Sequence, residues 1–289
     1  MYNYSIVIPH KNSSELLKRC LESLPVRDDL QVIVVDDNSD QVDFDAFPGL
    51  NEPNVRVVFD KTGLGAGHAR NVGMGLAEGK WLVFADCDDF FVTDAFNEQL
   101  DKWKDSQADL VFFKIRYVDS KTLEEDPKPH KANTVYDMAK SSGDYNYVRF
   151  RRNAPWAKFY RNEFIKENKI SFQESRWSND VWFSTNAALL AKHIEYSDAV
   201  IYNYTFSANS LIKATSREAL LCRLSVALQG EGLLIDNGFG RYRAKHIEYW
   251  HNRLLFRFIP DYFRRIVPVV RKIGLYAYMR GVASYVKNG

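Results

Sequence analysis

Cysteine is scarce in this chain of 289 residues, which contains only Cys20, Cys87 and Cys222. An odd number of widely spaced cysteines argues against a disulfide framework and against a thiolate metal site. The expected location is therefore a reducing one, the cytoplasm. A secretory signal is also lacking, because the N-terminus runs directly into the strand-like segment 4–8.

Long apolar runs are lacking too, since no stretch approaches the roughly 20 residues that a membrane-spanning helix needs. The net charge is only +2, but it is unevenly distributed. Residues 241–289 hold eleven Lys and Arg against two acidic residues, a surplus of nine positive charges. This distribution favours a globular protein, soluble or peripheral on the inner face of the cytoplasmic membrane, with a basic tail that meets an anionic surface.

The first hundred residues alternate short β-branched runs with helical patterns. Strands are expected over 5–9, 31–37, 55–60 and 81–89, with helices over 13–24 and 67–78. Continuous apolar strands separated by helices predict an α/β protein with a parallel sheet covered on both faces.

The rest of the chain is mixed. Strands are expected over 109–119 and 199–206, a polar loop over 124–131, and helices after 149–161, over 178–194 and from about 216 onwards. Ser178 or Asn179 would cap the helix over 178–194.

Polar residues follow three of the expected strands, in segments 9–11, 36–39 and 86–89. Ligands of parallel sheets bind beyond the carboxyl ends of the strands. Asp86, Asp88 and Asp89 could bind a hard divalent cation such as Mg²⁺ or Mn²⁺, or form a solvated turn. The acids and amides of 36–39 fit an ordinary turn equally well, or could accept a hydrogen bond from a nucleotide base.

The glycine-rich segment 62–73 fails the G-x-G-x-x-G test for dinucleotide binding, because the last position falls on His68 or Arg70. Its glycines more simply permit tight turns before a helix. Arg70 suits a phosphate or a base edge, although it would also be unremarkable on the surface.

Taken in order, these segments resemble the inverting glycosyltransferases of family 2 over about residues 4–212. The first half contributes SIVIP (5–9), VVDDNS (34–39), the glycine-flanked Ala-Arg-Asn segment (65–73) and LVFADCDD (82–89). The second half contributes PWAKFYRNEF (155–164), ISFQESRWSNDVWF (170–183) and VIYNYTFSANSL (200–211).

The resemblance implies the GT-A fold, a Rossmann-like, mostly parallel sheet flanked by helices. Residues 1–215 would form the catalytic domain, with a nucleotide-sugar-binding half over 1–100 and an acceptor half over 101–215. Residues 216–289 would form a helical, basic C-terminal extension that the resemblance does not cover.

The resemblance also assigns donor-binding roles. Asp37, with Asp36 beside it, would bind the base of a nucleotide sugar, and the backbone at Pro9 would line the base pocket. Arg70 would lie near the nucleotide and Asp86 near its ribose.

By the same resemblance, Asp88 would coordinate Mn²⁺ or Mg²⁺, supported by Asp89, and Asp180 would be the general base. Trp156 and Lys158 would shape the acceptor side. From the residues alone, Asp180 is better explained as an acid that the dipole favours in the first turn of a helix.

The chain departs from the family pattern at two places. Asn179 stands where a Glu usually precedes the base, and an amide cannot titrate, which affects acceptor recognition. The segment 204–211 also lacks a His that some relatives use for a further metal or phosphate contact.

The basic tail contains an amphipathic helical pattern over 244–259. Its apolar face is formed by Ile247, Trp250, Leu254 and Phe258, and the surrounding arginines are Arg253, Arg257, Arg264 and Arg265. Such a helix can lie on an anionic membrane or pack onto the catalytic domain. Nucleic acid is a poorer partner, because the tail contains no recognisable binding module.

The predicted activity is therefore transfer of a sugar from a nucleotide sugar, a UDP-sugar by the resemblance, to a saccharide hydroxyl. The acceptor would belong to a cell-surface polysaccharide such as capsule or O-antigen, and a lipid-linked acceptor would explain the tail. Two alternatives stay open: a nucleotidyltransferase, and a non-catalytic sugar-binding or scaffold protein on the same fold.

Overall fold

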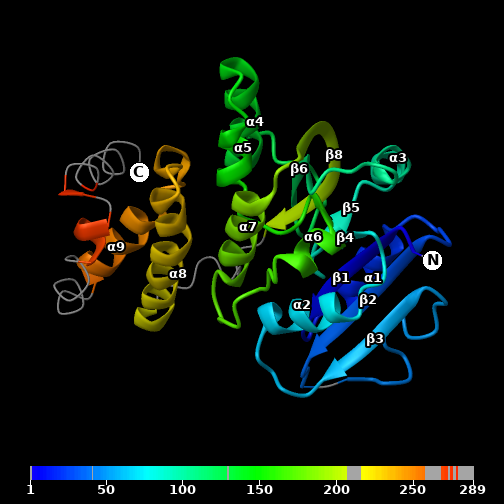
Figure 1. Cartoon of the computed structure of the whole chain (residues 1–289). Helices are drawn as coiled ribbons and strands as arrows, with labels where there is room; N and C mark the ends of the chain where they lie inside the picture. Colours follow the sequence, from blue (N-terminus) through cyan, green and yellow to red (C-terminus); the bar gives the residue numbers. More distant parts are fainter. Residues whose placement is uncertain are drawn as a thin grey trace.

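The computed structural model describes residues 2–40, 42–128, 130–206 and 216–257, together with 268–272, 274, 275 and 278. The side chains of residues 131 and 254–257 are outside this description. Figure 1 shows a central sheet with helices around it and further helices beyond one side of it.

One sheet of eight strands organises the molecule. Its strands are β1 (Tyr4–His10), β2 (Leu30–Asp37), β3 (Val55–Asp60), β4 (Trp81–Phe84), β5 (Phe90–Phe91), β6 (Leu110–Asp119), β7 (Lys158–Arg161) and β8 (Ile194–Phe206). They lie in the order β3-β2-β1-β4-β7-β6-β8-β5. The strands β3, β2, β1 and β4 run parallel, as the sequence predicts. The strand β7 runs antiparallel between β4 and β6, so the sheet as a whole is mostly parallel.

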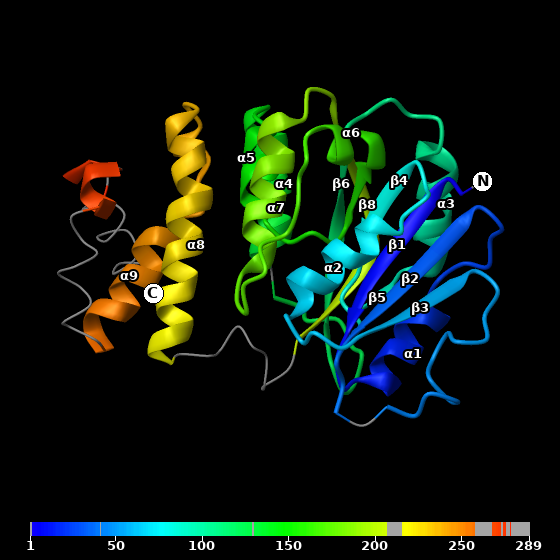
Figure 2. The same ribbon diagram turned by 60° about the horizontal axis from the view of Figure 1, so that its bottom comes forward.

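Helices cover both faces of this sheet. They are α1 (Ser14–Glu22), α2 (Ala66–Gly75), α3 (Thr93–Trp103), α4 (Lys131–Ser142), α5 (Asn146–Arg151), α6 (Asn162–Glu167) and α7 (Asn179–Leu190), whereas α8 (Arg217–Asp236) and α9 (His246–Arg257) lie beyond α7 (Figure 1). Leu17 of α1 and Phe96 of α3 share one core cluster, whereas Ala69 of α2 and Phe183 of α7 belong to the cluster on the other face. Figure 2 shows α1 and α2 on opposite sides of the first three strands.

Two expected elements have different limits in the structure. The strand expected over 81–89 ends at Phe84, and the acids that follow lie in a turn, in which Asp88 is exposed and Asp89 is buried. The helix expected over 178–194 ends at Leu190, because Ile194 already pairs with Leu110 in a long parallel ladder. Tertiary strand pairing thus overrides the local helical pattern at this point.

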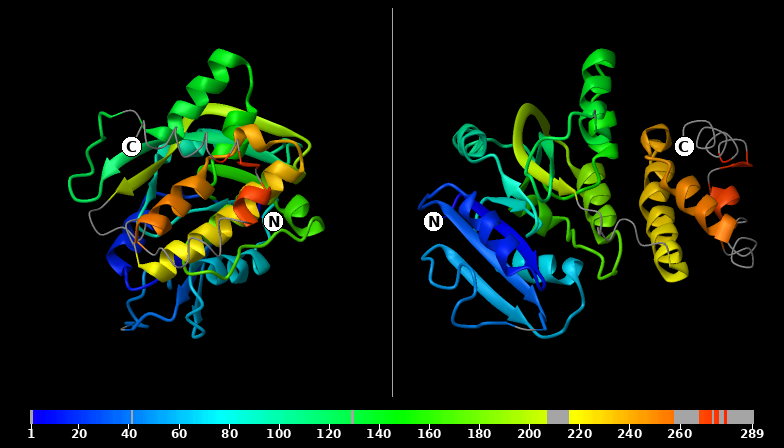
Figure 3. Two further views of the ribbon diagram at one scale, coloured as in Figure 1. Left: turned by 90° about the vertical axis from the view of Figure 1, so that its left-hand side faces the viewer. Right: turned by 180° about the vertical axis from the view of Figure 1, so that it is seen from behind.

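The C-terminal helices pack onto the domain through α8. A Cβ on Gly230 would lie 3.0 Å from Cγ1 of Val181, so α8 approaches α7 closely. The buried Arg243 lies between α8 and α9 in the chain and joins them by ion pairs to Glu231 of α8 and Glu248 of α9. Figure 3 shows this yellow-to-red part of the chain on the side away from the first strands.

The apolar face expected on the tail helix is buried where the structure describes it. Ile247 of α9 is completely buried with Leu220 and Leu224 of α8, and Trp250 packs against the same cluster. Phe258, Arg264 and Arg265 and the side chains of Leu254 and Arg257 lie outside the described residues. Among the described helices, none is long and apolar enough to cross a membrane.

Candidate active site

The first part of the site lies where β1 and β2 end side by side. His10 is paired with Asp36 in the parallel register, and its Nδ1 lies 2.7 Å from Oδ1 of Asp36. Because Nε2 of His10 accepts the backbone N–H of Ser13, the ring hydrogen belongs on Nδ1 and points at Asp36. Burial alone would raise the pKa of Asp36, but hydrogen bonds from Ser39 and His10 outweigh it and lower the pKa. Asp36 is fully buried and ionised, and it holds the two strand ends together.

Asp37, the next residue, anchors the glycine-rich segment. Its Oδ1 accepts the backbone N–H of Gly65 over 2.9 Å, and Nζ of Lys11 lies 3.6 Å from its Oδ2. Gly65 has a φ of +94°, in the left-handed region that favours glycine. Pro9 is buried in β1, opposite Val35. The ends of β1 and β2 and the start of α2 therefore form one connected rim.

Arg70 of α2 connects this rim to the second half of the chain. The helix lies tightly against β1, because a Cβ on Gly73 would approach Cγ1 of Val7 to 2.4 Å. The buried Arg70 guanidinium forms an ion pair with Asp86 through Nη2 and donates from Nη1 to Oδ1 of Asn179 over 2.8 Å. It thus joins the acidic turn after β4 to the first turn of α7.

The acidic turn brings three carboxylates together. Asp86, Asp88 and Asp89 each offer one oxygen within 4.8 Å of the others. Desolvation and the neighbouring Asp86 raise the pKa of Asp88 to about 6, and burial followed by Asp88 and Asp86 raises the pKa of the buried Asp89. Asp89 also has a buried Oδ2 with no partner in the described part of the protein. Repelling carboxylates with a free buried oxygen fit a hard divalent cation.

The last strand of the domain holds this turn in place through residues that the sequence analysis did not single out. The hydroxyl of Tyr202 in β8 accepts the backbone N–H of Asp86 over 2.9 Å. Thr205 donates its backbone N–H to Asp89 over 2.7 Å and its hydroxyl to the carbonyl of Asp88 over 2.8 Å. The available signal was the Tyr-x-Tyr-Thr segment 202–205, which carries three hydroxyl groups within four residues.

Asp180 lies in the first turn of α7, next to Asn179. Burial raises the pKa of its half-buried carboxyl, while the positive charge of Arg70 acts in the opposite direction. The negative charge of Asp86 also raises this pKa, so Asp180 interacts electrostatically with the acidic turn. In the described part of the chain no ion pair engages the carboxylate of Asp180. This arrangement leaves a carboxylate of increased basicity at the rim of the site.

The expected helix cap of α7 is not formed by a side chain. Ser178 occupies the N-cap position with a φ of +58° but makes no capping hydrogen bond. Asn179 is the first helical residue, and its amide is used otherwise: Oδ1 accepts from Arg70, and Nδ2 donates to the carbonyl of Ser175 over 3.3 Å. The side chain of Asn179 therefore binds Arg70 in the candidate site and does not cap the helix.

Trp156 and Lys158 are both buried, below the expected acceptor side. The indole of Trp156 stacks on Tyr202 with ring centroids 5.4 Å apart, behind the acidic turn. Nζ of Lys158 donates to the carbonyls of Arg152 and Ala154, and burial followed by the charge of Arg152 lowers its pKa. Lys158 thus supports the surrounding backbone and Trp156 supports the ring of Tyr202, and their place on the acceptor side stays a prediction.

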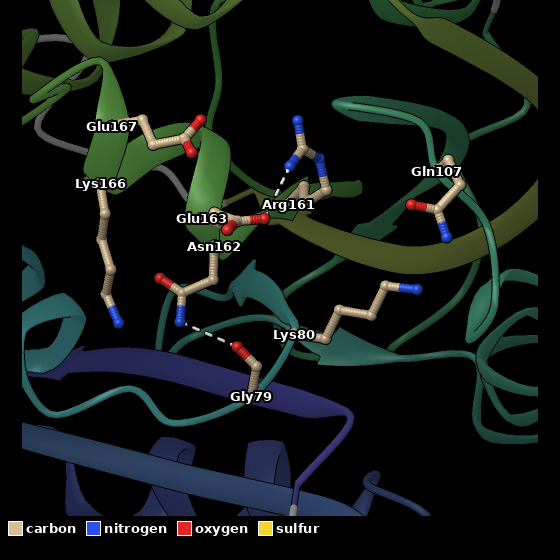
Figure 4. Close-up of a pocket in the computed structure, with 8 residues that line it drawn as sticks. All are labelled: Gly79, Lys80, Gln107, Arg161, Asn162, Glu163, Lys166 and Glu167. Atoms are coloured by element: carbon tan, nitrogen blue, oxygen red, sulfur yellow. Dashed lines mark hydrogen bonds and ion pairs between the residues drawn. The ribbon is translucent and has the colours of Figure 1, made fainter.

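A pocket of about 460 Å³ lies elsewhere, at the opposite end of β4 (Figure 4). Gly79 and Lys80 line it just before that strand, whereas the acidic turn follows the strand. Asn162 reaches across to donate to the carbonyl of Gly79 over 2.8 Å, and Arg161 pairs with Glu163. None of the acids expected to act in the site lines this pocket.

Comparison with known proteins agrees with this geometry. Residues 5–171, more than half of the chain, match the description of glycosyl transferase family 2. The poly(ribitol-phosphate) beta-glucosyltransferase of Bacillus spizizenii is 29% identical over 69% of this chain, which spans 32% of that enzyme. EpsH of Bacillus subtilis, which is named as a glycosyltransferase, is 26% identical over 81% of this chain and 69% of its own length.

A solved structure matches most of the chain. The crystal structure of Staphylococcus aureus TarS 1-349 in complex with UDP-GlcNAc has a TM-score of 0.64 and 20% sequence identity, and it covers 98% of this chain and 82% of that one. This likeness establishes the fold and confirms the α/β architecture expected from the sequence. The chain therefore belongs to glycosyl transferase family 2 and is a glycosyltransferase with the GT-A fold.

Proposed function

We propose that this glycosyltransferase moves one sugar from a UDP-sugar to a hydroxyl of a cell-surface polysaccharide, with inversion at the anomeric carbon. The observation that carries the proposal is the link from the acidic turn through Arg70 to the start of α7. This link joins the acidic turn, which can hold a cation for a diphosphate, to the carboxylate of Asp180, which can accept the proton of a hydroxyl. The binding of UDP-GlcNAc by TarS and the name of the B. spizizenii enzyme support the choice of donor and acceptor class.

In this proposal the rim formed by β1, β2 and α2 receives the nucleotide. Asp37 and the backbone at Pro9 contact the base, and Asp86 contacts the ribose. The buried Asp36 acts through its neighbours, because its oxygens are taken by His10 and Ser39. Arg70 fixes Asp86 and places positive charge beside the donor.

Asp88 would hold Mn²⁺ or Mg²⁺, with Asp89 as its support. When bound, such a cation supplies the positive charge that stabilises a departing diphosphate. The hydrogen bonds from Thr205 would keep Asp89 oriented toward the turn.

Asp180 would act as the general base. It takes the proton of the acceptor hydroxyl while the hydroxyl oxygen bonds to the anomeric carbon of the donor. The bond from that carbon to the diphosphate breaks on the opposite side, and its electron pair leaves with UDP. The raised pKa of Asp180 suits this role, because a more basic carboxylate accepts the proton more readily.

We also propose the division into a catalytic domain over 1–215 and a C-terminal extension over 216–289. It is supported by the end of β8 at Phe206 and the start of α8 at Arg217. The surplus of positive charge over 241–289 would attract this extension to an anionic membrane surface that carries a lipid-linked acceptor. With Ile247 buried, this attraction would rely on charge and not on insertion of that face.

The test is incubation of the full chain with a panel of nucleotide sugars, Mn²⁺ and saccharide acceptors, with release of nucleoside diphosphate as the readout. We expect UDP from one or more UDP-sugars, and loss of turnover with retained donor binding in Asp180→Asn. Release of pyrophosphate would indicate a nucleotidyltransferase. Donor binding without turnover in the wild type would indicate a sugar-binding or scaffold protein.

A further inference from the structure

A second pocket, of about 320 Å³, lies between α8 and the segment that leads into α7. Its polar lining comes from Gln173, Glu174 and Ser175 of this segment and from Cys222, Ser225 and Gln229 of α8. The three α8 residues are spaced by three and four positions, so they share one face of that helix. The C-terminal extension therefore contributes one whole wall of the pocket.

Both walls are held close to the catalytic domain. A Cβ on Gly67 would lie 2.1 Å from the carbonyl oxygen of Gln173, so the segment 171–178 rests directly on the first turn of α2. On the other side, Gly230 brings α8 against Val181 of α7. The amide of Gln173 donates to that of Gln229 across the pocket, while its own oxygen is buried without a described partner. The pocket is therefore pre-formed, with the two amide side chains joined across it.

The pocket begins where the candidate active site ends. The carbonyl of Ser175, one of its lining residues, accepts the hydrogen bond from Nδ2 of Asn179. Asn179 in turn accepts from Arg70, which holds Asp86, and it precedes Asp180 in the chain. These contacts run from the acidic turn through Arg70 and Asn179 to the pocket. A ligand in the pocket would thus lie one hydrogen-bonded contact away from the residue that precedes Asp180.

The chemistry of the lining favours an uncharged ligand. Its polar side chains are mainly amides and hydroxyls, and Glu174 is the single charged residue in its described lining. Oε1 of Glu174 lies 2.7 Å from Nδ1 of His68, whose Nε2 lies 3.1 Å from Asp60. The hydrogen bond that His68 donates to Glu174 raises the pKa of His68, which favours the charged imidazolium that neutralises Glu174. Among the described residues that line the pocket, none is a cation that could hold a phosphate, in contrast to the pocket in Figure 4, which has Lys80, Arg161 and Lys166.

We propose that this pocket binds the acceptor: it holds a neutral, polyhydroxylated sugar unit next to the one whose hydroxyl reacts at Asp180. The proposal rests on the proposed function and adds to it the place and the charge class of the acceptor. Side-chain amides and hydroxyls both donate and accept hydrogen bonds, as the hydroxyls of a sugar require. The C-terminal extension is then a part of the acceptor site.

The first experiment exposes the full chain, with UDP and Mn²⁺ present, to an array of neutral, phosphate-bearing and carboxylate-bearing oligosaccharides. We expect neutral glycans to bind to the wild type. Gln229→Leu should weaken this binding about five- to tenfold, the loss expected for one or two hydrogen bonds. The matched control is Gln107→Leu, because Gln107 is an exposed glutamine that lines the other pocket. Binding restricted to charged glycans, no glycan binding, or equal binding by both variants would overturn the proposal.

The second experiment uses Cys222 as a reporter, since this free, half-buried thiol lines the pocket. A neutral glycan that binds should slow alkylation of Cys222 at least threefold, whereas UDP alone should leave its rate unchanged. An unchanged rate with saturating glycan would place the glycan elsewhere and overturn the proposal.

The slow release of UDP from the donor in the absence of acceptor distinguishes a failure of the proposed function from a failure of the proposed acceptor pocket. The wild type should show this release, and its absence there would count against the proposed function and not against the pocket.

Discussion

Arg70 donates a hydrogen bond to the side-chain oxygen of Asn179 over 2.8 Å, while its other amino group pairs with Asp86. A neutral amide thus occupies a place beside the guanidinium where the family resemblance leads us to expect a carboxylate. Arg70 can therefore direct its charge to Asp86 and, through space, to Asp180. The residue at position 179 therefore determines how strongly the positive charge of Arg70 acts on the carboxylate of Asp180.

Replacement of Asn179 by Glu should change the pH dependence of the reaction. The new carboxylate would pair with Arg70 and add negative charge near Asp180, which raises the pKa of Asp180 further. A general base must be ionised, so the acidic limb of the kcat/KM profile should move to higher pH. The comparison is with Asn179→Gln, which remains neutral. Superimposable profiles for wild type and Asn179→Glu would show that Asp180 does not govern this limb.

Replacement of Arg70 by Lys should impair transfer although it keeps the charge. A single ammonium cannot span Asp86 and Asn179 as the planar guanidinium does. We expect kcat/KM to fall roughly 10- to 100-fold, as when a positioning contact is lost. Arg56→Lys, an exposed exchange in β3, is the matched control and should retain full activity. Steady-state kinetics with saturating acceptor measure both, and equal activities would remove Arg70 from the proposed machinery.

Binding of Mn²⁺ should weaken as the pH falls. The pKa of Asp88 is raised to about 6, so its carboxyl becomes protonated between pH 7 and pH 5, and protons then compete with the metal ion. Titration calorimetry should therefore give a higher Kd at pH 5.5 than at pH 7.5. Asp88→Ala should abolish this dependence together with tight binding, and Asp28→Ala, at an exposed aspartate, should not. A Kd that is constant with pH would argue against Asp88 as a ligand.

Replacement of Lys158 by Met should affect stability before anything else. Removal of Nζ leaves the buried carbonyls of Arg152 and Ala154 without their donor. We expect the free energy of unfolding to fall by about 2–6 kcal/mol, at about 1–3 kcal/mol for each of the two unpaired carbonyls. Lys166→Met serves as the control, because Lys166 is exposed. Urea denaturation measures both, and a Lys158 variant as stable as the control would contradict the structural role.

Local sequence patterns predicted many of the strands and helices of the fold. The strand over 55–60 has the expected limits, and the polar strand ends at 9–11, 36–39 and 86–89 are evident from the order of the residues alone. Other elements were missed. The helix α3 was not expected, although Phe96, Leu100 and Trp103 recur at helical spacing, and neither was α4. The apolar strand runs next to them give a stronger pattern and obscured the helical one.

The sequence by itself determined the alternation of strands and helices, the family, and which acids stand at strand ends, because these depend on neighbouring residues and their order. Only the tertiary structure decided how those acids differ. It buried Asp36 against His10, placed Lys158 beneath the surface, and brought Arg70 to Asn179 across 109 residues of chain. Burial and pairing of such distant residues depend on the packing of the whole sheet and its helices, and no local pattern encodes them.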